Sequence, residues 1–198
     1  MAHLPLSNVL WGERSIERAR RWIDRIRPLV DGATADAVPE HVRFEIMDFT
    51  AAALGEAIEV LEKAKTQLED AYRKRGKSKS QAEKRAKDFV RDWLQPRSFM
   101  RGMLAVRHLD VHVEARYSGR MIKMQANGAS EGERVWWTHP AIPKSQHDLL
   151  HASSRLSEDE LATFNQHMLD TDVLRVLAEM LDEVSQFQKA LAAELLMR

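Results

Sequence analysis

The sequence contains no cysteine, which excludes disulfide bonds and thiolate metal sites, so a metal ion would need histidine and carboxylate ligands. Glycine and proline are scarce, at 8 and 6 of 198 residues, and this composition favours a globular, largely helical protein. No apolar run reaches the roughly 18 residues that a membrane span requires. The N-terminus also lacks the basic segment and apolar run of a secretory signal. We therefore expect no membrane partner and a cytoplasmic location.

The sequence has no net charge, because 30 Lys and Arg residues balance 30 Asp and Glu residues. The distribution is uneven: residues 1–120 carry an excess of basic side chains, and residues 121–198 carry an excess of acidic ones. The densest basic stretch, RKRGKSKSQAEKRAK at 73–87, has the charge to contact phosphates. We interpret it as a solvated connection between two helices, because a dedicated nucleic-acid binder usually carries a stronger basic bias.

Apolar residues recur at steps of three and four along most of the chain, which is typical of helices that pack in a bundle. The expected helices run from Val9 to Ile26, from about Pro39 to Tyr72, from the Ser80–Glu83 capping box to Pro96, from Pro96 to about Tyr117, from residue 158 onward, and from the Thr171 N-cap to Leu195. In the longest helix the apolar series is Phe44, Met47, Ala51, Leu54, Ile58, Leu61, Leu68 and Tyr72, and only Lys65 interrupts it. The fold class is therefore all-α: one domain over residues 1–198, built as a bundle of about five to six helices.

Residues 118–145 differ from the rest in composition. Asn127-Gly128, two further glycines and two prolines lie between short apolar runs. This pattern predicts a small β-hairpin or a long loop inserted at 118–145. Trp136 and Trp137 would face opposite sides of a strand. An exposed tryptophan can stack on a base or a partner, but sealing the underside of a loop is the more usual role.

The helix expected after Pro96 carries an unusual concentration of ionisable residues, RHLDVHVE at 107–114. The apolar series of this helix is Phe99, Met103, Val106, Val113 and Tyr117. Asp110 falls within this series, where a carboxylate is costly unless a partner satisfies it. That partner is either a structural arginine or hydroxyl, or a functional group that Asp110 orients. His108 and His112 are neighbours at i and i+4, and together with Arg101 they lie on the face opposite the apolar series.

Two interpretations of this face need no catalysis. In the first, His108 and His112 belong to an exposed face of a helical interaction or scaffold protein. In the second, they bind a metal ion, joined by His147 and His151 of a second HxxxH pair or by His41. The glutamate that follows the first histidine in a zinc-protease helix is absent, and the spacing alone is weakly specific.

A third interpretation comes from a family resemblance. Arg107, the polar His108, three further residues and then His112 spell R-[polar]-x₃-H, and in an all-helical chain this resembles the signature of the HEPN superfamily of prokaryotic toxin and defence ribonucleases. The resemblance implies a metal-independent endoribonuclease that needs no cofactor. Arg107 would contact the scissile phosphate and stabilise its developing charge. His112 would act as the general acid/base for attack by the ribose 2′-OH, and His108, with Asp110 in support, would orient the pair.

The resemblance also implies an oligomeric state and partners. Five residues place Arg107 and His112 about 140° apart around an ideal helix, so one helix does not easily aim both side chains at one atom. In the HEPN family the active cleft lies between two protomers. We therefore expect a homodimer packed along residues 97–117, with RNA as substrate and an antitoxin protein as a further partner.

Overall fold

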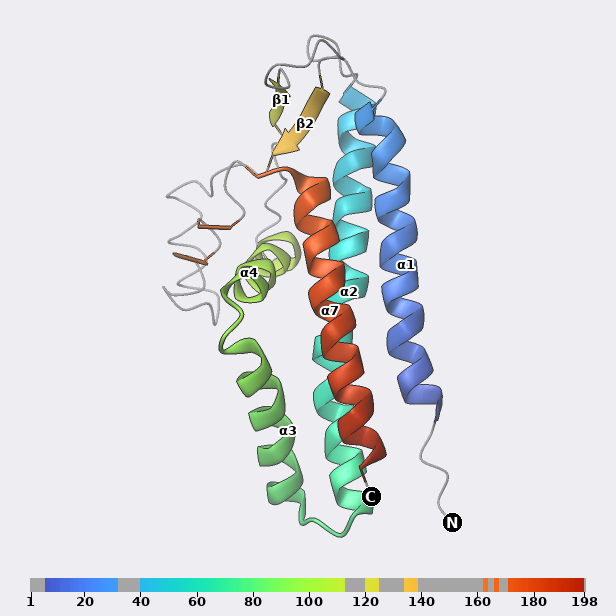
Figure 1. Ribbon diagram of the computed structural model, residues 1–198, viewed down its shortest axis with the longest axis vertical. Coiled ribbons are helices and arrows are strands. Elements are labelled where there is room, and N and C mark those ends of the chain that lie inside the picture. Colours follow the sequence, from blue (N-terminus) through green and yellow to red (C-terminus); the bar gives the residue numbers. More distant parts are fainter. Residues whose placement is uncertain are drawn as a thin grey trace.

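The computed structural model describes residues 6–31, 40–112, 120–124, 134–138, 162–163, 166–167 and 171–197. The helices are α1 (Leu6–Asp31), α2 (Glu40–Lys74), α3 (Lys79–Leu94), α4 (Ser98–His112) and α7 (Val173–Leu196). Helices α1, α2 and α7 run side by side, α3 lies along the part of the bundle nearest the C-terminus, and α4 crosses the bundle (Figure 1). This arrangement confirms the predicted all-α bundle. None of the described helices has the length and apolar character needed to cross a membrane.

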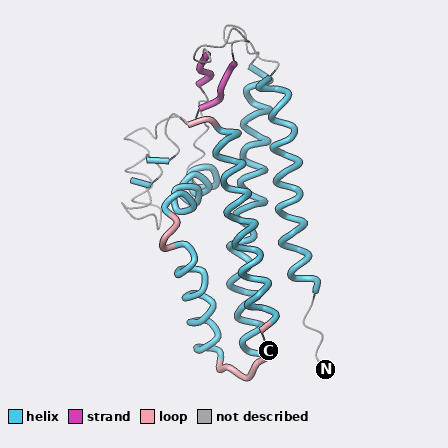
Figure 2. Tube along the Cα trace, in the orientation of Figure 1, coloured by secondary structure: helices cyan, strands magenta, loops and turns pink. Residues whose placement is uncertain are grey.

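A two-stranded antiparallel sheet follows α4 in the chain, which agrees with the first of the two alternatives, a β-hairpin or a long loop, that the sequence left open for 118–145. Its strands are β1 (Arg120–Met124) and β2 (Arg134–Thr138). The sheet lies at the end of the bundle opposite the start of α1 and the end of α7 (Figure 2), and β2 contacts α1 and α7. The predicted turn at Asn127-Gly128 and the side chains of Trp136 and Trp137 lie outside the described residues.

The start of α3 differs from the prediction by two residues. The capping box is formed by Ser78 and Gln81: the Gln81 N–H donates to Ser78 Oγ at 3.3 Å, and the Ser78 N–H donates to the Gln81 side chain at 3.2 Å. The predicted box of Ser80 and Glu83 is wrong, because the helix begins at Lys79 and both residues already lie within it. Both pairs have the three-residue spacing that a capping box requires, and the helix begins at the earlier pair.

The N-cap of α7 is Asp172 rather than the predicted Thr171. The Asp172 carboxylate accepts a hydrogen bond from the Arg175 N–H at 3.1 Å. Burial raises the pKa of Asp172, although the backbone N–H groups at the helix start act in the opposite direction. Two adjacent residues that can both cap a helix are not separable from sequence spacing alone.

Helix α2 is the central element, since it contacts α1, α3, α4 and α7. The predicted apolar series is largely buried, with Leu54, Ile58 and Leu68 fully inaccessible, although Phe44 at its start is 44% exposed. A second set of buried residues lies outside that series: Ile46, Ala53, Ala57, Val60, Ala64 and Ala71. A helix surrounded by neighbours is buried around most of its circumference, and its alanines leave room for the adjacent helices to approach.

A close contact between α1 and α7 depends on glycine. Gly12 is buried in α1, and a Cβ added there would overlap the side-chain amide of Gln188, which is 5% exposed on α7. An added methyl group would therefore displace the Gln188 amide from its buried position. Gly55 on α2 provides the contrast, because a Cβ added there would meet nothing within 4 Å.

We expect Gly12→Ala to lower the free energy of unfolding by about 1 to 2 kcal/mol, because overpacking outweighs the better helix propensity of alanine. Gly55→Ala, the matched control, should stabilise the protein by up to about 1 kcal/mol. Urea denaturation of both variants measures the difference. In a Gln188→Ala background the cost of Gly12→Ala should disappear, and an unchanged cost there would contradict the proposed overlap.

The turn between α2 and α3 is tied to the end of α7. Arg75 Nη2 donates hydrogen bonds to the carbonyl oxygens of Glu194 and Leu195 at 2.9 and 2.8 Å, so its positive charge stabilises the C-terminus of α7. The Tyr72 hydroxyl donates to Glu194 Oε1 at 2.8 Å. Burial is the main cause that raises the pKa of Tyr72 from 10.0 to about 12, and this hydrogen bond is the second cause.

The pKa of Tyr72 predicts a loss of stability at alkaline pH. The folded state favours the protonated phenol, so the contribution is fully present below the unfolded pKa near 10 and is lost as the pH rises to about 12. We expect Tyr72→Phe to remove this component and to flatten the pH dependence of stability between those values. Urea denaturation of the wild type and the variant at about pH 9 and about pH 11 tests this, since the two proteins differ only in the Tyr72 hydroxyl. Parallel pH profiles would contradict it.

Candidate functional site on helix α4

Contacts at its start fix the position of α4. Arg97 Nε donates to Glu183 Oε2 on α7 at 3.0 Å, and its Nη1 donates to the Trp93 carbonyl at 2.7 Å. The same guanidinium lies 4.2 Å from the centroid of the Trp93 ring. Downstream, Phe99, Met103 and Val106 are buried, as the predicted apolar series required. Helix α4 is therefore anchored to both α3 and α7 at its first turn.

A histidine that sequence reasoning did not single out also contacts α4. His167 Nε2 lies 2.8 Å from Ser98 Oγ, in hydrogen-bond contact. Its ring meets Phe99 edge-on, with centroids 6.1 Å apart. No local pattern marks His167 in the sequence, because Ser98 is 69 residues away and the contact exists only in the folded chain.

Arg107, the predicted phosphate-contacting residue, is half-buried and lines an open groove of about 390 Å³. The other lining residues come from α1 and α2: Trp22, Ala52, Gly55, Glu56, Glu59 and Glu62. We call this the acidic groove. The three carboxylates attract the positive charge of Arg107. Within the same chain they repel a phosphate that approaches the Arg107 side chain.

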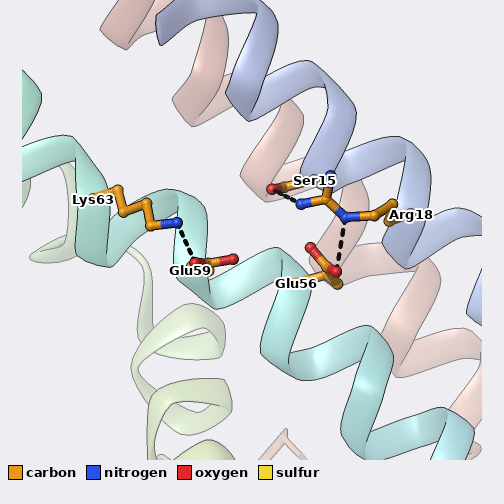
Figure 3. Close-up of polar contacts among 5 residues, drawn as sticks. All are labelled: Ser15, Arg18, Glu56, Glu59 and Lys63. Atoms are coloured by element: carbon orange, nitrogen blue, oxygen red, sulfur yellow. Dashed lines mark hydrogen bonds and ion pairs between the residues drawn. The ribbon is translucent and has the colours of Figure 1, made fainter.

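Cations of the same chain accompany two of these carboxylates. Arg18 on α1 donates from Nε to Glu56 Oε1 and from Nη2 to Ser15 Oγ, both at 2.8 Å, and Glu59 forms an ion pair with Lys63 (Figure 3). The hydrogen bond to Glu56 raises the pKa of Arg18, so this guanidinium stays charged. Both pairs offset part of the negative charge of the acidic groove, and the Arg18–Glu56 pair also joins α1 to α2.

A second groove, of about 650 Å³, lies between α2, α3 and α4. Four cationic side chains line it: Lys65, Lys87, Arg91 and Arg101. The remaining lining residues are Val90, Leu94, Gln95 and Leu104, so no carboxylate lines the groove among the residues that the structure describes. We call this the basic groove. Helix α4 contributes Arg107 to the acidic groove and Arg101 to the basic groove, and thus borders two surfaces of opposite charge.

The remaining predicted site residues are placed only by their backbone. His108, Asp110 and His112 lie in α4, but their side chains are outside the described residues, as are His147 and His151. Steps of about 100° per residue put His108 and His112 on the same stripe of α4 as Arg101. Within the part of the chain that the structure describes, no group of three or more His, Asp and Glu side chains is arranged to hold a metal ion.

Comparison of the chain with protein-family models, curated proteins and solved structures gave no match. Function must therefore be inferred from the chemistry of α4 and its two grooves.

Proposed function

We propose that this chain is a HEPN-like, metal-independent RNA-cleaving or RNA-binding protein of a cytoplasmic toxin or defence system. Arg107 and His112 are the proposed catalytic pair, with His108 and Asp110 in support. One observation supports the proposal most: the R-[polar]-x₃-H stretch lies on an uninterrupted helix, and that helix borders a groove lined by four cationic side chains. Clustered lysine and arginine side chains are what binding to a phosphate backbone requires.

The proposed reaction uses only side chains of the protein. A histidine that titrates near neutrality can accept the ribose 2′-OH proton and return a proton to the leaving 5′-oxygen. The guanidinium of Arg107 keeps its charge and matches the geometry of phosphate oxygens, so it suits the charge that develops at phosphorus. RNA cleavage is therefore expected to proceed in EDTA.

The position of Arg107 favours a dimeric enzyme. Arg107 lines the acidic groove between α1 and α2, whereas the helical position of His112 is about 140° away around α4. One chain does not readily bring both side chains to a single phosphate. Packing of two copies along α4 would allow Arg107 of one protomer to act with His112 of the other, so the proposal includes a homodimer.

The test is cleavage of total RNA in EDTA by the purified wild type, Arg107→Ala and His112→Ala. Circular dichroism confirms that each variant is folded, and light scattering gives the oligomeric state. Cleavage by a wild-type dimer that both variants lose would support the ribonuclease. A well-folded dimer that cleaves no RNA would instead favour the role in RNA or partner binding.

A second candidate function is a non-catalytic helical interaction protein. The acidic groove favours it, because Trp22 and three glutamates suit the apolar and basic side chains of a lysine- or arginine-rich partner segment, such as part of an antitoxin. The His-ligated metal bundle is a third candidate that no described contact favours. Metal analysis of the purified protein separates it from the other two.

A further inference from the structure

We infer that the basic groove binds the phosphate backbone of single-stranded RNA and guides the strand along α4 towards His112. This inference rests on the proposed function and specifies where the substrate is held. It goes beyond the resemblance to HEPN ribonucleases, because that resemblance covers essentially residues 101–116 and does not include Lys65 or Lys87.

The charge of the basic groove is assembled from three helices. Lys65 comes from α2, Lys87 and Arg91 come from α3, and Arg101 comes from α4. The two lysines are exposed, whereas Arg101 is half-buried. Arg91 already pairs with Asp88 and Asp92 at 2.8 Å each, so its attraction for a phosphate is weakened. Lys65 and Lys87 are therefore the side chains on which the inference chiefly depends.

The apolar part of the basic groove suits a single strand better than a duplex. Val90, Leu94 and Leu104 line the groove between the cationic side chains. In a single strand the bases are free to turn towards apolar side chains while the phosphates stay with the lysines. In a duplex the bases are paired and stacked inside, so these apolar side chains would have no base faces to contact.

The path of the RNA along α4 follows from the positions of Arg101, His108 and His112, which share one stripe of this helix. From Arg101 to His112 this stripe extends about 16 Å along the helix axis. A strand held by phosphate contacts at Arg101 therefore needs to continue only a short distance along the same face to reach the proposed acid/base. Arg107 lies on the other flank, in the acidic groove, and is expected to contribute to cleavage rather than to this binding.

The test is the affinity for a fluorescein-labelled oligouridylate of about 12 nucleotides, within the range of single-strand site sizes. Its 2′-OH groups are methylated, so the proposed 2′-OH attack does not cleave it during the measurement. Fluorescence anisotropy in EDTA, over a series of NaCl concentrations, compares the wild type with Lys65→Gln/Lys87→Gln. The matched control is Lys77→Gln/Lys79→Gln, which removes the same charge from exposed positions outside the groove. Losing two phosphate contacts should make the slope of log K against log salt less negative by about 1.4, because each contact contributes about 0.7.

We expect the Lys65/Lys87 variant to bind about tenfold more weakly at low salt, since each phosphate contact adds to the electrostatic affinity. The control should bind like the wild type. No binding by the wild type, or equal losses in both double variants, would overturn the inference. Equal affinity for duplex RNA would overturn the single-strand assignment, and equal, lysine-dependent affinity for oligoglutamate would overturn the assignment to RNA.

Failure of this inference and failure of the proposed function give different results. Lysine-dependent RNA binding without cleavage of any RNA would retain the binding site and remove the catalytic role. Cleavage that needs His112 but not Lys65 or Lys87 would retain the ribonuclease and place its substrate elsewhere on the protein.

Discussion

His112→Ala is expected to reduce the rate of RNA cleavage by about 100- to 10,000-fold, the usual contribution of a positioned general acid/base. The affinity for oligouridylate should change little, because the proposed binding contacts come from the basic groove. The matched control is His41→Ala, which removes an exposed histidine from the first turn of α2 and should retain full activity. Equal cleavage by all of these proteins would indicate a contaminating nuclease and leave His112 as a residue of a helix face.

A mixing experiment sharpens this prediction. If each active site takes Arg107 from one protomer and His112 from the other, a heterodimer of Arg107→Ala and His112→Ala chains contains one complete pair. Mixing the two inactive variants under conditions that exchange protomers should then restore part of the activity. A stable heterodimer that remains inactive would contradict the shared site. Arg107→Lys should regain little of the cleavage activity that Arg107→Ala loses, because an ammonium lacks the two parallel donors of a guanidinium.

Phe187→Ala is expected to lower the free energy of unfolding by about 3 to 5 kcal/mol, the usual cost of truncating a buried phenylalanine. Phe187 on α7 is fully buried. Its ring meets Trp93 of α3 edge-on with centroids 4.9 Å apart, and it lies 6.0 Å from Phe89, also of α3. The substitution removes these aromatic contacts and leaves a cavity between α3 and α7.

Leu196→Ala is the control for this prediction, because Leu196 lies on the same helix but is 63% exposed and should change stability by no more than about 0.5 kcal/mol. Urea denaturation of both variants gives the two free energies. Helix α3 forms one wall of the basic groove. Phe187→Ala should therefore also weaken oligouridylate binding at urea concentrations that partly unfold α3 in the variant. A loss of less than about 1 kcal/mol would mean that neighbouring side chains refill the cavity.

Local patterns determined the fold class. Apolar residues at steps of three and four predicted the long helices, and the glycine-rich stretch around Asn127-Gly128 predicted either a hairpin or a loop, of which the structure has the hairpin strands. Helix starts were less well determined, because Ser78 and Ser80 compete as caps and so do Thr171 and Asp172. Such choices depend on fine backbone geometry that spacing does not encode.

The grooves were decided by the tertiary structure alone. In the sequence Lys65 is only an interruption of an apolar series, and in the fold it joins Lys87 and Arg101 from two other helices to line the basic groove. The family resemblance likewise predicted that Arg107 contacts a phosphate, without indicating that Glu56, Glu59 and Glu62 line the same groove. Helical periodicity reports which residues of one helix share a face, whereas the charge of a groove depends on how separate helices pack together. The sequence by itself therefore determined the helices and the R-[polar]-x₃-H stretch, and helix packing decided which charges surround them.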